Sequence, residues 1–67
     1  MKAIRDLING NLTDAKAAAN SRTYFAILNA AQDQYGMSLE EARNTADYLK
    51  GIITHKTYCQ NSHAINN

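Results

Sequence analysis

Apolar residues recur every three or four positions along most of the chain, which is the spacing of one helix face. Near the N-terminus, Ile4, Leu7 and Ile8 follow this spacing and predict a short first helix that stops at Asn9-Gly10. Asn-Gly is also a β-hairpin signal, but no alternating apolar and polar run flanks it and the chain contains no Val. We therefore expect a helix end there rather than a hairpin.

A long second helix is predicted over residues 14–35, with Thr13 as its N-cap. The segment is rich in Ala, and one stripe of it keeps helical spacing: Tyr24, Leu28, Ala31 and Tyr35. Asn20-Ser21 is the weak point of this helix, because both side chains compete for backbone hydrogen bonds and Ser21 could cap a separate helix. A kink or a break, if one occurs, is expected at that pair.

A third helix is predicted to start at Leu39 and to continue to about Tyr58. Its apolar positions keep a rhythm of three and four that passes across Gly51: Leu39, Ala42, Ala46, Leu49 and Ile53. Gly51 inside such a helix costs about 1 kcal/mol relative to Ala. Residues 60–67 are mostly polar and are expected to form a flexible tail.

A very short turn joins the second and third predicted helices. Gly36 suits the left-handed residue that closes a helix, and Ser38 suits the N-cap of the next one, with Glu41 completing a capping box. Helices joined so closely pack most simply as a hairpin. The sequence therefore predicts an all-α fold, a small three-helix domain made of a helical hairpin about the Gly36-Met37-Ser38 turn plus a short N-terminal helix.

The length and composition of the chain restrict the kind of protein it can be. Its 67 residues allow a single helical domain, 1–67, whose core is small because such a chain buries only about 60% of the surface it exposes when unfolded. A net charge of +1 does not select nucleic acid as a partner. Cys59 is the only Cys, which excludes an intramolecular disulfide. The N-terminus lacks the apolar run of a signal peptide and no stretch approaches a membrane span, so we expect a cytoplasmic protein that does not bind membranes.

The short turn is also the basis of the alternative function, a helix-turn-helix transcription regulator. Gly36, Met37 and Ser38 resemble the turn of helix-turn-helix DNA readers, with the resemblance covering about twenty residues from Gln32. In that arrangement the helix from Leu39 would enter the major groove with its first residues near the phosphates. Two of these residues are Glu40 and Glu41, whose carboxylates oppose phosphate, and only Arg43 and Lys50 offset them. DNA binding is therefore the weaker expectation.

Two further groupings of residues give little support to metal binding or catalysis. His55, Cys59 and His63 are spaced by four and would share one face of a helix, but a structural zinc site needs a fourth ligand. Adjacent Glu40 and Glu41 point about 100° apart on a helix and do not converge on a substrate. We therefore expect no metal, no cofactor and no enzymatic activity.

Recognition of another protein is the function that remains. Tyr is enriched at interfaces because it combines an apolar ring with a polar tip, and four of the five aromatic residues are Tyr. The sequence predicts a small protein-binding module, a stoichiometric modulator or inhibitor of the kind that phages and mobile elements encode, and a homodimer stays open. The expected contact residues form one stripe on the last predicted helix: Tyr48, Ile52, His55 and Cys59.

Overall fold

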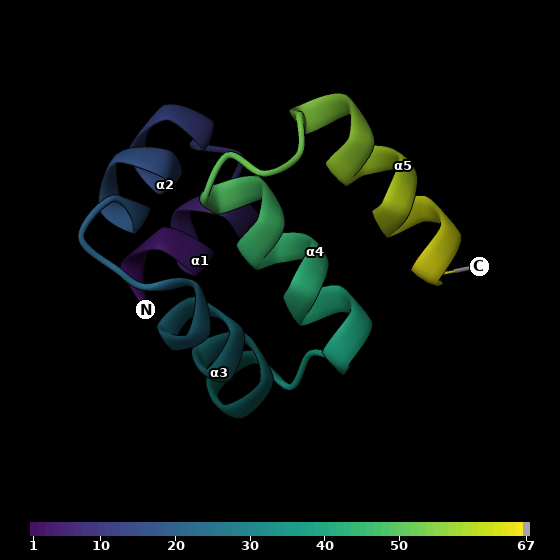
Figure 1. Cartoon of the computed structure of the whole chain (residues 1–67), viewed down its shortest axis with the longest axis horizontal. Coiled ribbons are helices and arrows are strands. Elements are labelled where there is room, and N and C mark those ends of the chain that lie inside the picture. The colour runs from purple at the N-terminus through teal and green to yellow at the C-terminus, as the bar shows by residue number, and fades with distance from the viewer. Residues whose placement is uncertain (67) are drawn as a thin grey trace.

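The protein is all-α, as predicted, but the helices are shorter and more numerous than expected. The computed structural model describes residues 1–66, and within them it has no β-strand. Five helices follow one another along the chain: α1 (Lys2–Ile8), α2 (Leu12–Ala19), α3 (Tyr24–Tyr35), α4 (Leu39–Leu49) and α5 (His55–Asn66). The prediction of three helices was wrong because each of the two longer predicted helices is interrupted (Figure 1).

The first interruption lies at the weak point that the sequence indicated. α2 ends at Ala19, and Thr23 begins α3 by accepting a hydrogen bond at its side-chain oxygen from the Ala26 N–H, with an N···O distance of 3.1 Å. The Nζ of Lys50 donates to the carbonyl oxygens of Ala19 and Arg22, at 3.1 and 2.8 Å. A cation therefore satisfies one carbonyl at the C-terminal end of α2 and one in the link to α3, which stabilises the break.

The second interruption overrides the apolar rhythm that passes across Gly51. Gly51 has a φ of +75°, and two hydrogen bonds close α4 around it: the Gly51 N–H to the Tyr48 carbonyl and the Ile52 N–H to the Asp47 carbonyl. This pair of bonds is a Schellman motif, which requires a left-handed residue that Gly adopts at little cost. Thr54 then caps α5, because its Oγ1 accepts from the Thr57 N–H at 3.2 Å. The predicted continuous helix from Leu39 to Tyr58 was wrong for this reason.

The turn between α3 and α4 is built as predicted. Gly36 lies in the left-handed region with a φ of +65°, and the Ser38 Oγ accepts from the Glu41 N–H at 3.2 Å. The return bond from the Glu41 side chain stays a prediction. Thr13, by contrast, was wrongly predicted as an N-cap: α2 already begins at Leu12, and Asn11 precedes it.

The hydrophobic core lies between α1, α2, α3 and α4. Ile4 and Ile27 are its largest fully buried side chains, and Ala residues make up much of the rest. Short side chains allow the helices to approach one another closely, which is how so short a chain forms a core. The buried hydrophobic residues of the described chain all belong to these four helices: Ala3, Ile4, Leu7, Ala15, Ala19, Ile27, Leu28, Ala30, Ala31, Ala42, Ala46, Tyr48 and Leu49.

Helix α5 lies outside this core. It runs beside α4 on the side away from α1 and α2 (Figure 1), and none of its described residues is buried. The helix extends to Asn66 and so includes most of the segment predicted to be a flexible tail. Flexibility of that segment stays a prediction, and residue 67 lies outside the described residues.

Candidate functional site

The four residues predicted to contact a partner do not share one helix. Tyr48 belongs to α4, Ile52 lies in the link between helices, and His55 and Cys59 lie in the first turns of α5. A single helical stripe was the wrong description, because α4 ends at Leu49. Ile52 is 64% exposed, and His55 and Cys59 are exposed as well. A contact role for these residues stays a prediction.

Tyr48 is part of the core rather than of the surface. Its side chain is 4% exposed, and its ring packs against the rings of His55 and Tyr58 with centroid distances of 5.4 and 5.0 Å. The Nζ of Lys16 lies 4.8 Å from the centroid of the same ring. A partner could reach Tyr48 only after α5 moved away, so Tyr48 is better described as the anchor of α5.

His55 and Cys59 meet on one exposed face of α5. The Cys59 Sγ lies 3.6 Å from the His55 Nε2, one helical turn away. Among residues 1–66, no group of three or more His, Cys, Asp or Glu side chains is arranged to hold a metal ion. Within the same residues, no helix combines the length and the apolar character needed to cross a membrane.

The outer strip of α4 is the surface that a helix-turn-helix protein would present to DNA. It carries exposed Glu40 and Arg43 and the partly exposed Asp47. Lys50 is one of the two cations that the sequence offered for phosphate contacts, and it donates instead to the backbone carbonyls of Ala19 and Arg22. The strip therefore presents two carboxylates and one guanidinium, a balance that opposes the phosphate field.

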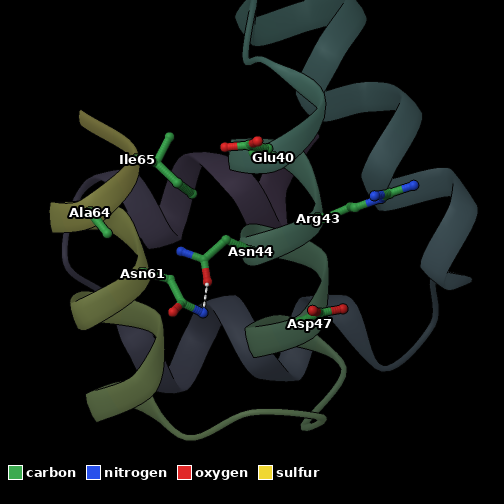
Figure 2. Close-up of a pocket in the computed structure, with 7 residues that line it drawn as sticks. All are labelled: Glu40, Arg43, Asn44, Asp47, Asn61, Ala64 and Ile65. Carbon is green, nitrogen blue, oxygen red and sulfur yellow. Dashed lines mark hydrogen bonds between the residues drawn. The ribbon is translucent and has the colours of Figure 1, made fainter. Parts of the chain in front are cut away.

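A groove separates this outer strip from α5. Its volume is about 310 Å³, and its lining comes from both helices: Glu40, Arg43, Asn44, Asp47, Asn61, Ala64 and Ile65. Glu40 and Ile65 lie at one end and Asp47 lies toward the other, whereas Arg43 is directed away from α5 (Figure 2). The groove thus combines an apolar wall, formed by α5, with carboxylates on α4.

Asn44 forms the floor of the groove and connects the two helices. Its side chain is 5% exposed, and its Nδ2 donates to the Tyr58 carbonyl and to the Ser62 Oγ, both at 3.0 Å. Its Oδ1 accepts from the Asn61 Nδ2, also at 3.0 Å (Figure 2). Three hydrogen bonds from one buried amide satisfy the polar atoms that the packing of α5 encloses. They also fix the width of the groove.

An aromatic pair on α3 is connected to the lining of the groove through Asp47. Phe25 is 70% exposed, and its ring meets the Tyr24 ring edge to face at a centroid distance of 5.9 Å. The Tyr24 hydroxyl donates to the Asp47 Oδ1 at 2.6 Å, and Asp47 also lines the groove. This hydrogen bond, followed by burial and the Asp47 charge, raises the pKa of Tyr24 above 10.0. We refer to Tyr24, Phe25 and the residues that line the groove as the aromatic–groove face.

Sequence reasoning missed Phe25, although the signal was present. Phe25 follows Tyr24 and so falls off the stripe that Tyr24 and Leu28 define, which puts it toward solvent on an amphipathic helix. No family model, curated protein or solved structure matches this chain. The aromatic–groove face is therefore interpreted from its own chemistry.

Proposed function

We propose that this chain is a small, non-enzymatic module that binds another protein through the aromatic–groove face and so modulates it stoichiometrically. The observation that carries the proposal is Phe25, a large apolar side chain that is 70% exposed. The core of this protein contains few large apolar side chains, yet this one is left at the surface. Single exposed apolar residues are common on protein surfaces. Phe25 differs because its ring packs edge to face on Tyr24, whose hydroxyl is bound to the groove residue Asp47.

The aromatic pair is ordered before any partner arrives. The Tyr24 ring supports Phe25 from the side, and the Tyr24 hydroxyl is in turn bound to Asp47 on α4. Ordering these side chains in advance lowers the entropy that binding would otherwise cost. Aromatic residues of this kind contribute a large share of the binding energy at protein interfaces, particularly where a neighbouring pocket accepts a side chain of the partner.

The chemistry of the groove indicates what the partner presents. Ala64 and Ile65 offer an apolar wall, and Glu40 lies at the end occupied by Ile65 (Figure 2). Arg43 is directed away from α5, so Glu40 is the charged side chain at the end of the groove that Ile65 occupies (Figure 2). A segment with an apolar side chain for the wall and a Lys or Arg for Glu40 complements this surface.

The test compares two exposed apolar residues on different helices. Phe25→Ala removes the aromatic anchor, whereas Ile8→Ala removes a side chain that is 59% exposed on α1 and outside the face. Both changes are at the surface, so both variants are expected to fold. Tagged wild type and variants are incubated with extract of the native host, and captured proteins are quantified by mass spectrometry.

We expect one partner to be captured in stoichiometric amount by wild type and by Ile8→Ala. Its binding to Phe25→Ala should be at least about tenfold weaker, the usual range for an aromatic hot spot. Equal capture by all three proteins would show that the face is not the binding site. Loss of capture by both variants would locate binding elsewhere or show that it is nonspecific.

A further inference from the structure

The sequence of the link between α4 and α5 is compatible with two backbone conformations, a helix end at Gly51 and a continuous helix. The apolar rhythm of α4 continues through Leu49 to Ile53, and Ile53 packs against the core even though it lies beyond the helix end. The helix nevertheless stops, because Gly51 takes a left-handed conformation with a φ of +75°. A continuous helix from α4 into α5 would keep the rhythm and would require Gly51 to become helical, which a glycine can do.

The contacts of α5 are directed at one face of α4. Asn44 binds the Tyr58 carbonyl, Ser62 and Asn61, and the Tyr48 ring packs on those of His55 and Tyr58. No described residue of α5 is buried, and among them Tyr58 is the hydrophobic side chain that packs, partly buried, against the core. Its place is therefore decided by this one interface and by the link.

A continuous helix would separate the two sides of that interface. Tyr48 and Tyr58 are ten residues apart, which along a helix is about 15 Å, too far for their rings to touch. The face of α4 around Asn44 and Tyr48 would then be uncovered, as would the face of α5 that carries Tyr58. These two faces complement each other, because they are the two halves of the interface seen in the monomer.

We propose that a second copy of this chain covers both faces by exchanging α5. In the resulting dimer α4 continues into α5 as one helix, and the α5 of each copy packs on the α4 of the other. Every contact between α4 and α5 is kept in the dimer. The equilibrium between monomer and dimer therefore depends on the backbone conformation at Gly51 and on the protein concentration. The groove persists as well, formed by α4 of one copy and α5 of the other.

Replacing Gly51 with Ala shifts this balance in a known direction. Ala is disfavoured in the left-handed conformation of the monomer and favoured over Gly inside a helix, and together these preferences amount to about 30-fold for each hinge. A dimer with two hinges is therefore strengthened about 1000-fold. A Cβ added at Gly51 has no atom within 4 Å outside its neighbours, so the variant is expected to fold.

Gly10 provides a matched control. It has a φ of +83°, its added Cβ also meets nothing within 4 Å, and the bonds Gly10 N–H to Leu7 carbonyl and Asn11 N–H to Asp6 carbonyl form the same motif. Gly10 differs in its place, because it lies in the link between α1 and α2 and not in the link that would straighten when α5 is exchanged. Gly10→Ala therefore imposes the same backbone strain without favouring an exchange of α5.

The experiment measures molar mass by light scattering over a concentration series for wild type and both variants. We expect Gly51→Ala to dimerise at concentrations about 1000-fold lower than wild type, and Gly10→Ala to behave like wild type. A Gly51→Ala protein that stays monomeric throughout the series, or equal dimerisation by both variants, would overturn the proposal.

The path of the chain is then tested in the dimer itself. Gly51→Ala protein labelled with ¹³C is mixed with unlabelled protein, unfolded and refolded together. Isotope-filtered NMR should detect contacts between the Tyr48 ring of one copy and the Tyr58 ring of the other. A dimer without these intermolecular contacts would be a different dimer and would refute the exchange. The wild-type dimer at high concentration gives the same readout without any substitution.

Discussion

Asn44→Ala is expected to release α5 from α4 while the core formed by the first four helices stays folded. The substitution removes all three hydrogen bonds by which the buried amide holds α5, at Tyr58, Ser62 and Asn61. The remaining contacts include the packing of the Tyr58 and His55 rings on Tyr48 and the side-chain hydrogen bond between Tyr58 and Thr45. No described residue of α5 is buried, so the apolar contact that opposes its release is mainly that of the partly buried Tyr58 with the core.

The expected size of the effect follows from the number of bonds. A hydrogen bond between neutral groups contributes about 1 kcal/mol net, so three contribute about 2–3 kcal/mol. A chain of this length has a total stability of about 3–10 kcal/mol. The loss is therefore a large fraction of the free energy that can hold α5, whereas the buried contacts of Ile4 and Ile27 are untouched.

Amide hydrogen exchange followed by NMR separates the two regions. A loss of about 2 kcal/mol in local opening makes exchange about 30-fold faster for the amides of α5. Amides near Ile27 in α3 are expected to change much less. Asn29→Ala is the matched control, because Asn29 is exposed on α3 and does not line the groove between α4 and α5.

Either of two results would refute this reasoning. Equal acceleration in α5 and in α3 would show that α5 unfolds together with the core and is not a separately attached helix. Unchanged exchange in α5 would show that the ring contacts at Tyr48 hold the helix and that the hydrogen bonds of Asn44 contribute nothing measurable.

Three further predictions concern single contacts. Asp47→Asn should lower the pKa of Tyr24 toward its ordinary value of 10.0, as measured by ultraviolet titration, because the carboxylate that opposes the phenolate is gone. In wild type the raised pKa means that folding stability should fall as the pH rises through it, and thermal melts above pH 10.0 should show a smaller loss in the variant. Ser38→Ala removes the cap of α4 and should lower the free energy of unfolding by about 1 kcal/mol in urea denaturation, with exposed Ser21→Ala near zero. Lys50→Met keeps the apolar stem but loses the bonds to the Ala19 and Arg22 carbonyls, and should cost about 1–2 kcal/mol in the same assay.

The helical class and the turn at Gly36 could be predicted because their signals are local. Gly36 adopts the left-handed conformation and Ser38 caps α4, as their residue types indicate. The end of α4 could not be predicted from the apolar rhythm. Ile53 continues that rhythm and packs on the core, although it lies beyond the last residue of the helix. A rhythm reports which side chains face the core, not whether the backbone between them is continuous.

Position in space explains why the four expected contact residues do not form one helical stripe. Tyr48 would face solvent on one continuous helix. In the structure it is covered, because Tyr58 and His55 lie on a separate helix that folds back over it. The same return of the chain brings Asn44 and Asn61 together and so forms the groove. None of these pairings follows from sequence spacing once the helix is broken at Gly51. The exposure of Phe25, by contrast, could have been predicted, because it depends only on the position of Phe25 around α3.

Photo-crosslinking from position 25 tests the central claim most directly. Phe25 is replaced by benzoylphenylalanine, which keeps an aromatic ring at the 70% exposed site, and Ile8 is replaced in the same way as the control. We expect one covalent product with a single host protein from position 25, suppressed by excess untagged wild type and absent from position 8. The same product from both positions, or none from position 25, would contradict it.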